Sequence, residues 1–224
     1  MNEVLGSILP NAVAIAISPI PIIAVILMLM SSRPRRLGLA FLGGWLVGVL
    51  VATSVITLLA GVIPEPDTSG GAQPVLGVIQ LVLGIGLLLL GIRQWRSRPA
   101  PGVEAQLPAW MSKIDSMGAL TALALAFALA AVNPKNLLVA AAAGSVIGRA
   151  GLDIGGIIIA IVCFTVVAAL TVAAPVLFAM IAPQKAAPAL ASIRAWLAAN
   201  NATIMTVVFA ILGTSVIGKG IGAF

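Results

Sequence analysis

Apolar residues are grouped along the chain in six long stretches, which short polar segments separate. The stretches run over approximately 4–30, 37–62, 74–95, 118–147, 152–181 and 200–221. Each is long enough to cross a bilayer, which takes about 20 apolar residues in a helix. The pattern therefore predicts an all-α integral membrane protein with six transmembrane helices in a single transmembrane domain over 1–224.

Proline interrupts the first and the fourth stretch. Pro19 and Pro21 lie near the middle of the first, and Pro134 lies in the fourth. Because proline lacks a backbone donor and pushes on the carbonyl four residues earlier, we expect both helices to be broken. The carbonyls of Ile15, Ile17 and Ala130 are then expected to lose their helical donors. A plain kink in each helix is the alternative, since proline is common in membrane helices.

The two halves of the chain resemble each other. A shift of 115 residues aligns 14–29 with 129–144 and brings the two proline breaks into register. Each half, about 1–95 and about 118–224, then holds three spans, and a cytoplasmic linker at about 96–117 joins them. Because three is odd, the second half enters the membrane from the opposite face. Such inverted repeats place the substrate site near the midplane in many secondary transporters.

Basic residues lie mostly on one side of the predicted membrane domain. The nine on that side are Arg33, Arg35, Arg36, Arg93, Arg96, Arg98, Lys113, Lys185 and Arg194. Only Arg149 and Lys219 lie on the other side, so the positive-inside rule predicts that both termini are outside. The chain is 61% hydrophobic and 8% charged, so its net charge of +6 reflects topology, and no nucleic-acid partner is predicted.

Lys135 is the one charged residue expected near the middle of a span. A charge at that depth costs about 3 kcal/mol or more unless it faces a wet cavity or a partner. All six acids of the chain fall in loops or at helix ends, so Lys135 is the only candidate for carrying a proton within the membrane. Binding an anionic substrate headgroup is a second role, and snorkelling to an interface is the structural alternative.

The residues at the two breaks form the candidate substrate-binding site. They are Ser18, Pro19, Pro21, Asn133, Pro134, Lys135 and Asn136. Thr53, Thr57 and Gln80 are candidates for lining a path, and Ser54, Thr165 and Thr171 carry the same weaker signal. The signal is weak because Ser and Thr in membrane helices commonly bond to their own backbone.

Two further patterns concern packing and the membrane interface. Glycines four residues apart favour close helix packing, and the pairs are Gly44 and Gly48, Gly144 and Gly148, and Gly151 and Gly155. A short interfacial helix is predicted, with a plain linker as the alternative, from the near-helical spacing of Leu107, Trp110, Met111 and Ile114. A topology anchor is the expected role of Arg33, Arg35 and Arg36, and binding of anionic lipid headgroups is the alternative.

The composition excludes several chemistries. The chain has one cysteine, Cys163, and no histidine. Electron transfer through thiols needs two of them in exchange reach, so a membrane oxidoreductase is excluded for a single chain. No Walker A loop occurs, and ATP coupling would need a partner protein. We predict no enzymatic activity, no catalytic residues, no metal and no cofactor.

The same broken segments carry a family resemblance. The sequence "ISPIPIIAVILMLMS" followed by "RPRRLGLAFLGGWLVGVL" resembles the start of the GAP family, the peptidoglycolipid-addressing proteins of the lysine-exporter (LysE) superfamily. "NPKNL" at 133–137 resembles the second hallmark of that superfamily. The "PIP" at 19–21 departs from the amino-acid exporters, which more usually show a glycine between the prolines.

The resemblance implies a protein of the plasma (inner) membrane that is required for moving envelope glycolipids or their precursors toward the cell surface. Its motif positions correspond to Ser18, Pro19, Pro21, Asn133, Pro134 and Lys135. Export of an amino acid or another small solute is one alternative, and a non-transporting scaffold for envelope lipid export is the other. Expected partners are membrane lipids, the glycolipid or precursor, envelope lipid synthesis or export proteins, and a second copy in a homo-oligomer.

Overall fold

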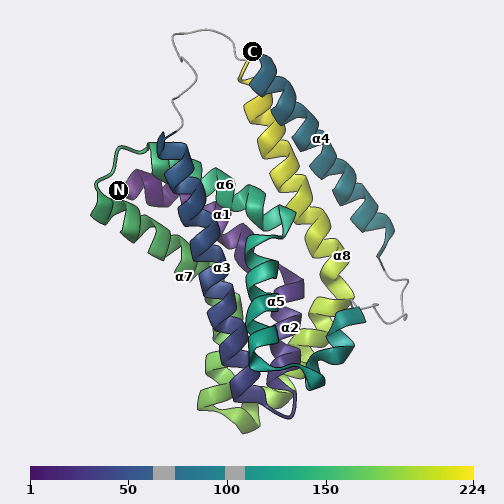
Figure 1. The fold of residues 1–224 in the computed structure, drawn as a ribbon. Coiled ribbons are helices and arrows are strands. Elements are labelled where there is room, and N and C mark those ends of the chain that lie inside the picture. The colour runs from purple at the N-terminus through teal and green to yellow at the C-terminus, as the bar shows by residue number, and fades with distance from the viewer. Residues whose placement is uncertain (63–73, 99–108) are drawn as a thin grey trace. The chain divides into compact units, whose positions relative to one another are not determined.

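The structure, a computed structural model, describes residues 1–62, 74–98 and 109–224. The predicted loop acids Glu65, Asp67 and Glu104, and Leu107 of the predicted interfacial helix, lie outside the described residues. The described residues form helices and no strand (Figure 1). They belong to two compact units. The first unit comprises Met1–Pro64 and Leu107–Ala195, and the second comprises Glu65–Gln106 and Trp196–Phe224.

Each of the six predicted spans is helical. The helices are α1 (Asn2–Ala16), α2 (Pro19–Leu29), α3 (Pro34–Val62), α4 (Pro74–Arg96), α5 (Ala119–Ala131), α6 (Pro134–Arg149), α7 (Ile154–Ile181) and α8 (Pro183–Ile221). By length and hydropathy, four of them can each cross a membrane. The number rises to six if α1 with α2 and α5 with α6 each form one bent span. The prediction of an all-α multi-pass membrane protein with broken first and fourth helices is confirmed.

Two of the segments between predicted spans are helical. The segment before the sixth span is part of α8, which already begins at Pro183. This segment is rich in alanine, the residue with the highest helix propensity, which favours helix over loop. The predicted interfacial helix forms as a 3₁₀ helix, η1 (Ala109–Ser116). It contacts α2 and buries Met111 and Ile114.

Both breaks follow the same local rule. Ser18 is extended (φ −71°, ψ 114°) and Pro19 begins α2, while Asn133 is extended (φ −60°, ψ 121°) and Pro134 begins α6. Proline suits the first helical position, where its missing donor costs nothing, and it drives the preceding residue to extended conformation. The axes change direction by 54° at the first break and by 60° at the second. The chain leaves the helical conformation at each break, so neither is a plain kink.

Small residues let the long helix α3 lie close to α5 and α6 (Figure 1). A Cβ atom at Gly48 would lie 2.7 Å from the Cβ of Ala130 on α5, and one at Gly144 of α6 would lie 3.1 Å from the Thr53 carbonyl of α3. The close packing predicted for the pairs at 44 and 48 and at 144 and 148 is therefore confirmed. The third predicted pair is wrong, because Gly151 has φ +61° and no neighbour within 4 Å of its added Cβ. Gly151 serves the turn before α7.

The core of the first unit lies between α3 and α7, which contact each other directly. Its largest buried side chains include Trp45 and Phe41 of α3 and Phe164 of α7. The Trp45 Nε1 atom donates a hydrogen bond to the Ala168 carbonyl, 3.3 Å away. Because α7 also packs on α1 and α2, this core connects the first broken helix to the second half of the chain.

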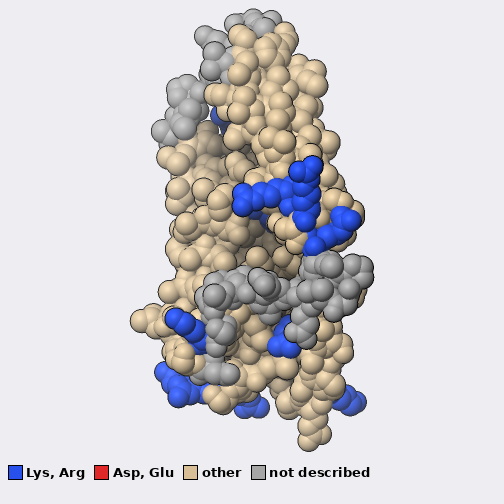
Figure 2. All heavy atoms as spheres, turned by 90° about the vertical axis from the view of Figure 1, so that its right-hand side faces the viewer, with Lys and Arg blue, Asp and Glu red and all other residues tan. Residues whose placement is uncertain are grey.

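Apolar side chains are exposed along the outer faces of the long helices. Examples on α3 are Val47, Val51, Val55 and Leu58, and on α7 they are Ile158, Val162, Val166 and Leu170. A surface of this kind suits hydrocarbon rather than water. Charged groups are few, and the face drawn in Figure 2 shows Lys and Arg side chains without a visible Asp or Glu among the described residues.

The second unit pairs α4 with the end of α8 through residues that recur every seven positions. A Cβ added at Gly77 would lie 3.0 Å from the Gly220 carbonyl, and one at Gly84 would lie 2.9 Å from the Gly213 carbonyl. Seven residues beyond Gly84 on α4, the Gly91 carbonyl accepts a hydrogen bond from the Thr206 hydroxyl at 3.3 Å. A seven-residue repeat keeps one face of each helix against its partner, and glycine lets the two backbones approach.

We predict that Gly84→Leu destabilises the protein. Its Cβ would lie 2.5 Å from the Ile217 Cγ1 atom and 2.9 Å from the Ile217 backbone nitrogen, so the helices must separate, and overpacking of this kind costs about 1–3 kcal/mol. Thermal unfolding of the purified protein in detergent measures the effect. The matched control is Gly86→Leu on the same helix, where an added Cβ meets nothing within 4 Å. Equal unfolding temperatures for the two variants would contradict close packing of α4 on α8 at Gly84.

Candidate functional site

The two breaks meet through the side chain of Lys135. Its Nζ atom donates to the Ala14 carbonyl at 2.7 Å and to the Ser18 hydroxyl at 2.5 Å. Ala14 lies in the last turn of α1, and Ser18 is the extended residue of the first break, whereas Lys135 is the second residue of α6. A side chain from the second half of the chain therefore ends on the break in the first half.

The structure changes which carbonyls of the first break need partners. Ile15 was expected to lose its donor, but its carbonyl accepts from the Ser18 backbone nitrogen at 3.2 Å. The carbonyls on either side of it accept from side chains instead: Lys135 donates to Ala14, and the Thr171 hydroxyl of α7 donates to Ala16 at 2.5 Å. The prediction for Ile15 is wrong because the last turn of α1 tightens to a three-residue bond, which helix ends commonly do.

The second break is closed by its own polar side chains. The Asn133 Oδ1 atom accepts from the Lys135 backbone nitrogen at 3.0 Å, which is the usual bond of an N-cap residue. The Asn136 amide donates to the Leu129 carbonyl at 3.0 Å. We expected Ala130 to be the carbonyl in need of a partner, and the Asn136 amide serves its neighbour Leu129 instead. Asn136 is 0% exposed, and its Oδ1 atom has no partner among the described residues.

The position of Lys135 combines an unfavourable and a favourable helix end. As the second residue of α6 it places a positive charge near a helix N-terminus, where cations are disfavoured. Its ammonium, however, lies at the C-terminal end of α1, where exposed carbonyls favour a cation. The side chain is 6% exposed and has no carboxylate partner among the described residues. Its charge therefore depends on the α1 carbonyl end and on Ser18.

This geometry decides between the two structural readings of Lys135. Snorkelling would carry the ammonium away from the protein interior to an interface. The ammonium instead bonds to the first break, and the side chain is buried among α1 and α6, which pack together. Pro19 and Pro21 of the first break are buried, whereas Pro134 of the second break is exposed.

The candidate path residues lie in different surroundings. Thr57 donates to the Thr53 carbonyl of its own helix at 2.8 Å, as is common for threonine in membrane helices. The Thr53 and Thr165 hydroxyls are buried without a partner among the described residues. Gln80 lies on α4 of the second unit, and its Oε1 atom is buried without a partner among the described residues. Thr171 had no stronger sequence signal than these, yet it is the threonine that bonds to a break.

Helix lengths, hydropathy and the two bent pairs define a multi-pass membrane protein with paired proline-broken helices. Over residues 8–222 the chain matches the family described as SfLAP: Sap, sulfolipid-1-addressing protein, and it belongs to that family. This family is a relative of the GAP proteins in the LysE superfamily, so the resemblance found in the sequence is confirmed. Neither a curated protein nor a solved structure matched the chain.

We predict that Thr171→Val destabilises the fold by about 0.6–2 kcal/mol, the range for hydrogen bonds between membrane helices. Valine has nearly the same shape but cannot donate to the Ala16 carbonyl. Unfolding of the purified protein in mixed micelles measures the loss. The matched control is Thr214→Val, because the exposed Thr214 hydroxyl donates only to carbonyls of its own helix. If both variants unfold alike, the bond from α7 to the first break contributes nothing to stability.

Proposed function

We propose that this protein moves an anionic envelope glycolipid, or its precursor, across the plasma membrane, with the paired breaks as the moving part. Membership of a family described as sulfolipid-1-addressing supports a role in envelope lipid export. The observation that carries the mechanism is the Lys135 ammonium bonded to Ala14 and Ser18. It is a buried cation whose partners in the described part of the chain are all neutral, so an anionic headgroup can compete for it.

The proposed cycle exchanges the partners of Lys135. In the conformation described here, the ammonium joins the second break to the first. An anionic headgroup that reaches Lys135 replaces neutral acceptors with a charged one, and opposite charges attract each other strongly where little water screens them. The ammonium then leaves the carbonyl end of α1, and the link between the two breaks is lost. The two halves are then free to rock and to open the site toward the other face.

The proposal includes a single transmembrane domain of two inverted repeats, about 1–95 and about 118–224. The bends of 54° and 60° at matching places support it. So does the composition of the units, because each takes helices from both repeats: the first unit holds the first two spans of each, and the second holds α4 with the end of α8.

We predict that Lys135→Gln lowers glycolipid export at least tenfold. Glutamine keeps hydrogen-bonding capacity for Ala14 and Ser18 but removes the charge that the headgroup needs. The measurement is the surface fraction of a labelled envelope glycolipid in cells that carry only the variant, at matched membrane levels. The control is Lys113→Gln in η1, where the lysine is exposed. Export at the level of the Lys113→Gln control would remove Lys135 from the mechanism.

The same cells separate the alternative functions. An amino-acid or small-solute exporter would show efflux of a labelled solute that depends on Lys135 and would leave surface glycolipid unchanged. A scaffold for envelope lipid export would lose function on changes in the segment at about 96–117 and tolerate changes at both breaks. Either pattern would replace the function proposed here.

The proposed orientation places both termini outside. In a Cys163→Ala background, we expect Asn2→Cys to react with a membrane-impermeant maleimide in right-side-out vesicles. Ser97→Cys, at the end of α4, is expected to react only after the vesicles are opened, because basic residues near it mark the cytoplasmic side. Both positions are exposed. The reverse labelling order would invert the proposed topology and the direction of access.

A further inference from the structure

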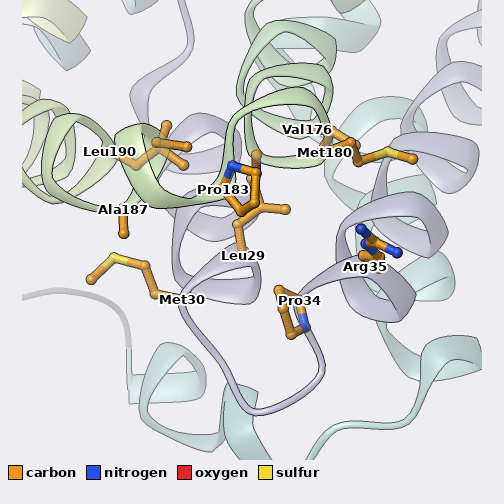
Figure 3. A pocket seen from close by; sticks show the side chains of 11 residues that line it. Leu29, Met30, Pro34, Arg35, Val176, Met180, Pro183, Ala187 and Leu190 are labelled. Carbon is orange, nitrogen blue, oxygen red and sulfur yellow. The ribbon is translucent and has the colours of Figure 1, made fainter.

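A pocket of about 380 Å³ lies in the first unit where α2 passes into α3 and α7 passes into α8. Figure 3 shows Leu29, Met30 and Pro34 on one side, with Pro183 and Leu190 coming from the facing chain segment. Leu29 is ten residues beyond Pro19, which is roughly 15 Å along a helix. None of the break residues lines the pocket, so it is a second feature of the first unit, apart from the cluster around Lys135.

The chemistry of the lining is asymmetric. Ten of the eleven lining residues are apolar, and the remaining one is Arg35. Figure 3 shows the Arg35 side chain at one end of the pocket, near Met180 and Pro34. Met30 and Met180 are 45% and 37% exposed, so the apolar surface opens outward. Methionine is flexible and adapts to irregular apolar ligands.

The charged residues in the lining and next to it in the sequence are all basic. Arg33 and Arg36 flank Arg35 in the sequence, Lys185 lies between the lining residues Pro183 and Ala186, and these neighbours are exposed. None of the lining residues is acidic. A cationic ligand is therefore disfavoured, and a neutral apolar ligand would leave Arg35 unused. A ligand with an apolar chain and an anionic group fits both parts of the pocket.

The volume of the pocket limits the size of the apolar part of the ligand. Ligand sites commonly span about 300–1,000 Å³, and this pocket is near the lower end. Basic clusters beside a membrane span attract anionic lipid headgroups, and this pocket lies at the ends of the spans that carry the basic residues. We infer that the pocket binds one acyl chain of an anionic bilayer lipid whose headgroup is held by Arg35.

This site is independent of the proposed export function. It requires that a lipid binds in the pocket, but it does not require that the protein transports that lipid. The probe is phosphatidylglycerol with a photoactivatable diazirine in one acyl chain, present in nanodiscs that contain the full chain. The matched neutral probe is phosphatidylcholine with the same chain. We expect phosphatidylglycerol to crosslink to peptides that contain Met30, Met180 or Leu190 at least fivefold more than phosphatidylcholine does.

Variants then separate the two parts of the site. Arg35→Gln is expected to lower phosphatidylglycerol crosslinking to the phosphatidylcholine level, and Arg35→Lys to retain most of it. Arg33→Gln, which removes an exposed charge outside the lining, is expected to change it less than twofold. Ala187→Phe fills the pocket from α8 and is expected to lower crosslinking of both probes.

Two outcomes would overturn the inference. One is equal crosslinking of the two probes in the unchanged chain, and the other is an equal effect of Arg35→Gln and Arg33→Gln. In either case the pocket has no anionic lipid site. This experiment reads binding rather than export, so its failure leaves the test of Lys135 untouched, and loss of the Lys135 mechanism leaves the pocket result standing.

Discussion

The two breaks of the first unit are joined by one buried contact, in which the Lys135 ammonium binds the carbonyl end of α1. This contact offsets the free-energy costs of two buried polar groups. A buried cation needs partners, and the carbonyl of Ala14, left by the break, needs a donor. Removing one partner would leave the other uncompensated, which is more expensive than either group alone. The contact therefore keeps the two breaks together although 121 residues separate them in sequence.

Around this contact the helices pack closely through small residues, and few hydrogen bonds join them. Glycine surfaces bring α3 onto α5 and α6, and Thr171 adds one hydrogen bond from α7 to the first break. Packing of small residues relies on van der Waals contact, which resists separation but leaves sliding open. A change at the breaks then has to exchange only a few hydrogen bonds, and this suits a membrane protein that alternates between two arrangements.

A protein that handles lipids has to satisfy a polar headgroup and apolar chains. The proposals assign these tasks to different depths of the first unit: the cluster around Lys135 for the headgroup in transit, and the pocket beside Arg35 for an acyl chain near the basic ends of the spans. The two sites share no residue. Membership of the sulfolipid-1-addressing family gives both proposals a common chemical theme, an anionic amphiphile.

Hydropathy and proline act locally, so the sequence by itself determined the long apolar helices and the two places where proline breaks them. Ser18 and Asn133 leave the helix where predicted because each precedes a proline. The sequence did not determine which groups donate hydrogen bonds to the backbone carbonyls at the first break. Ile15 is served within its own turn, and Ala14 and Ala16 are served by Lys135 and Thr171. Only the tertiary structure decided the partners of Ala14 and Ala16, because hydrogen bonds reach about 3 Å, and packing alone brings Lys135 and Thr171 within that reach.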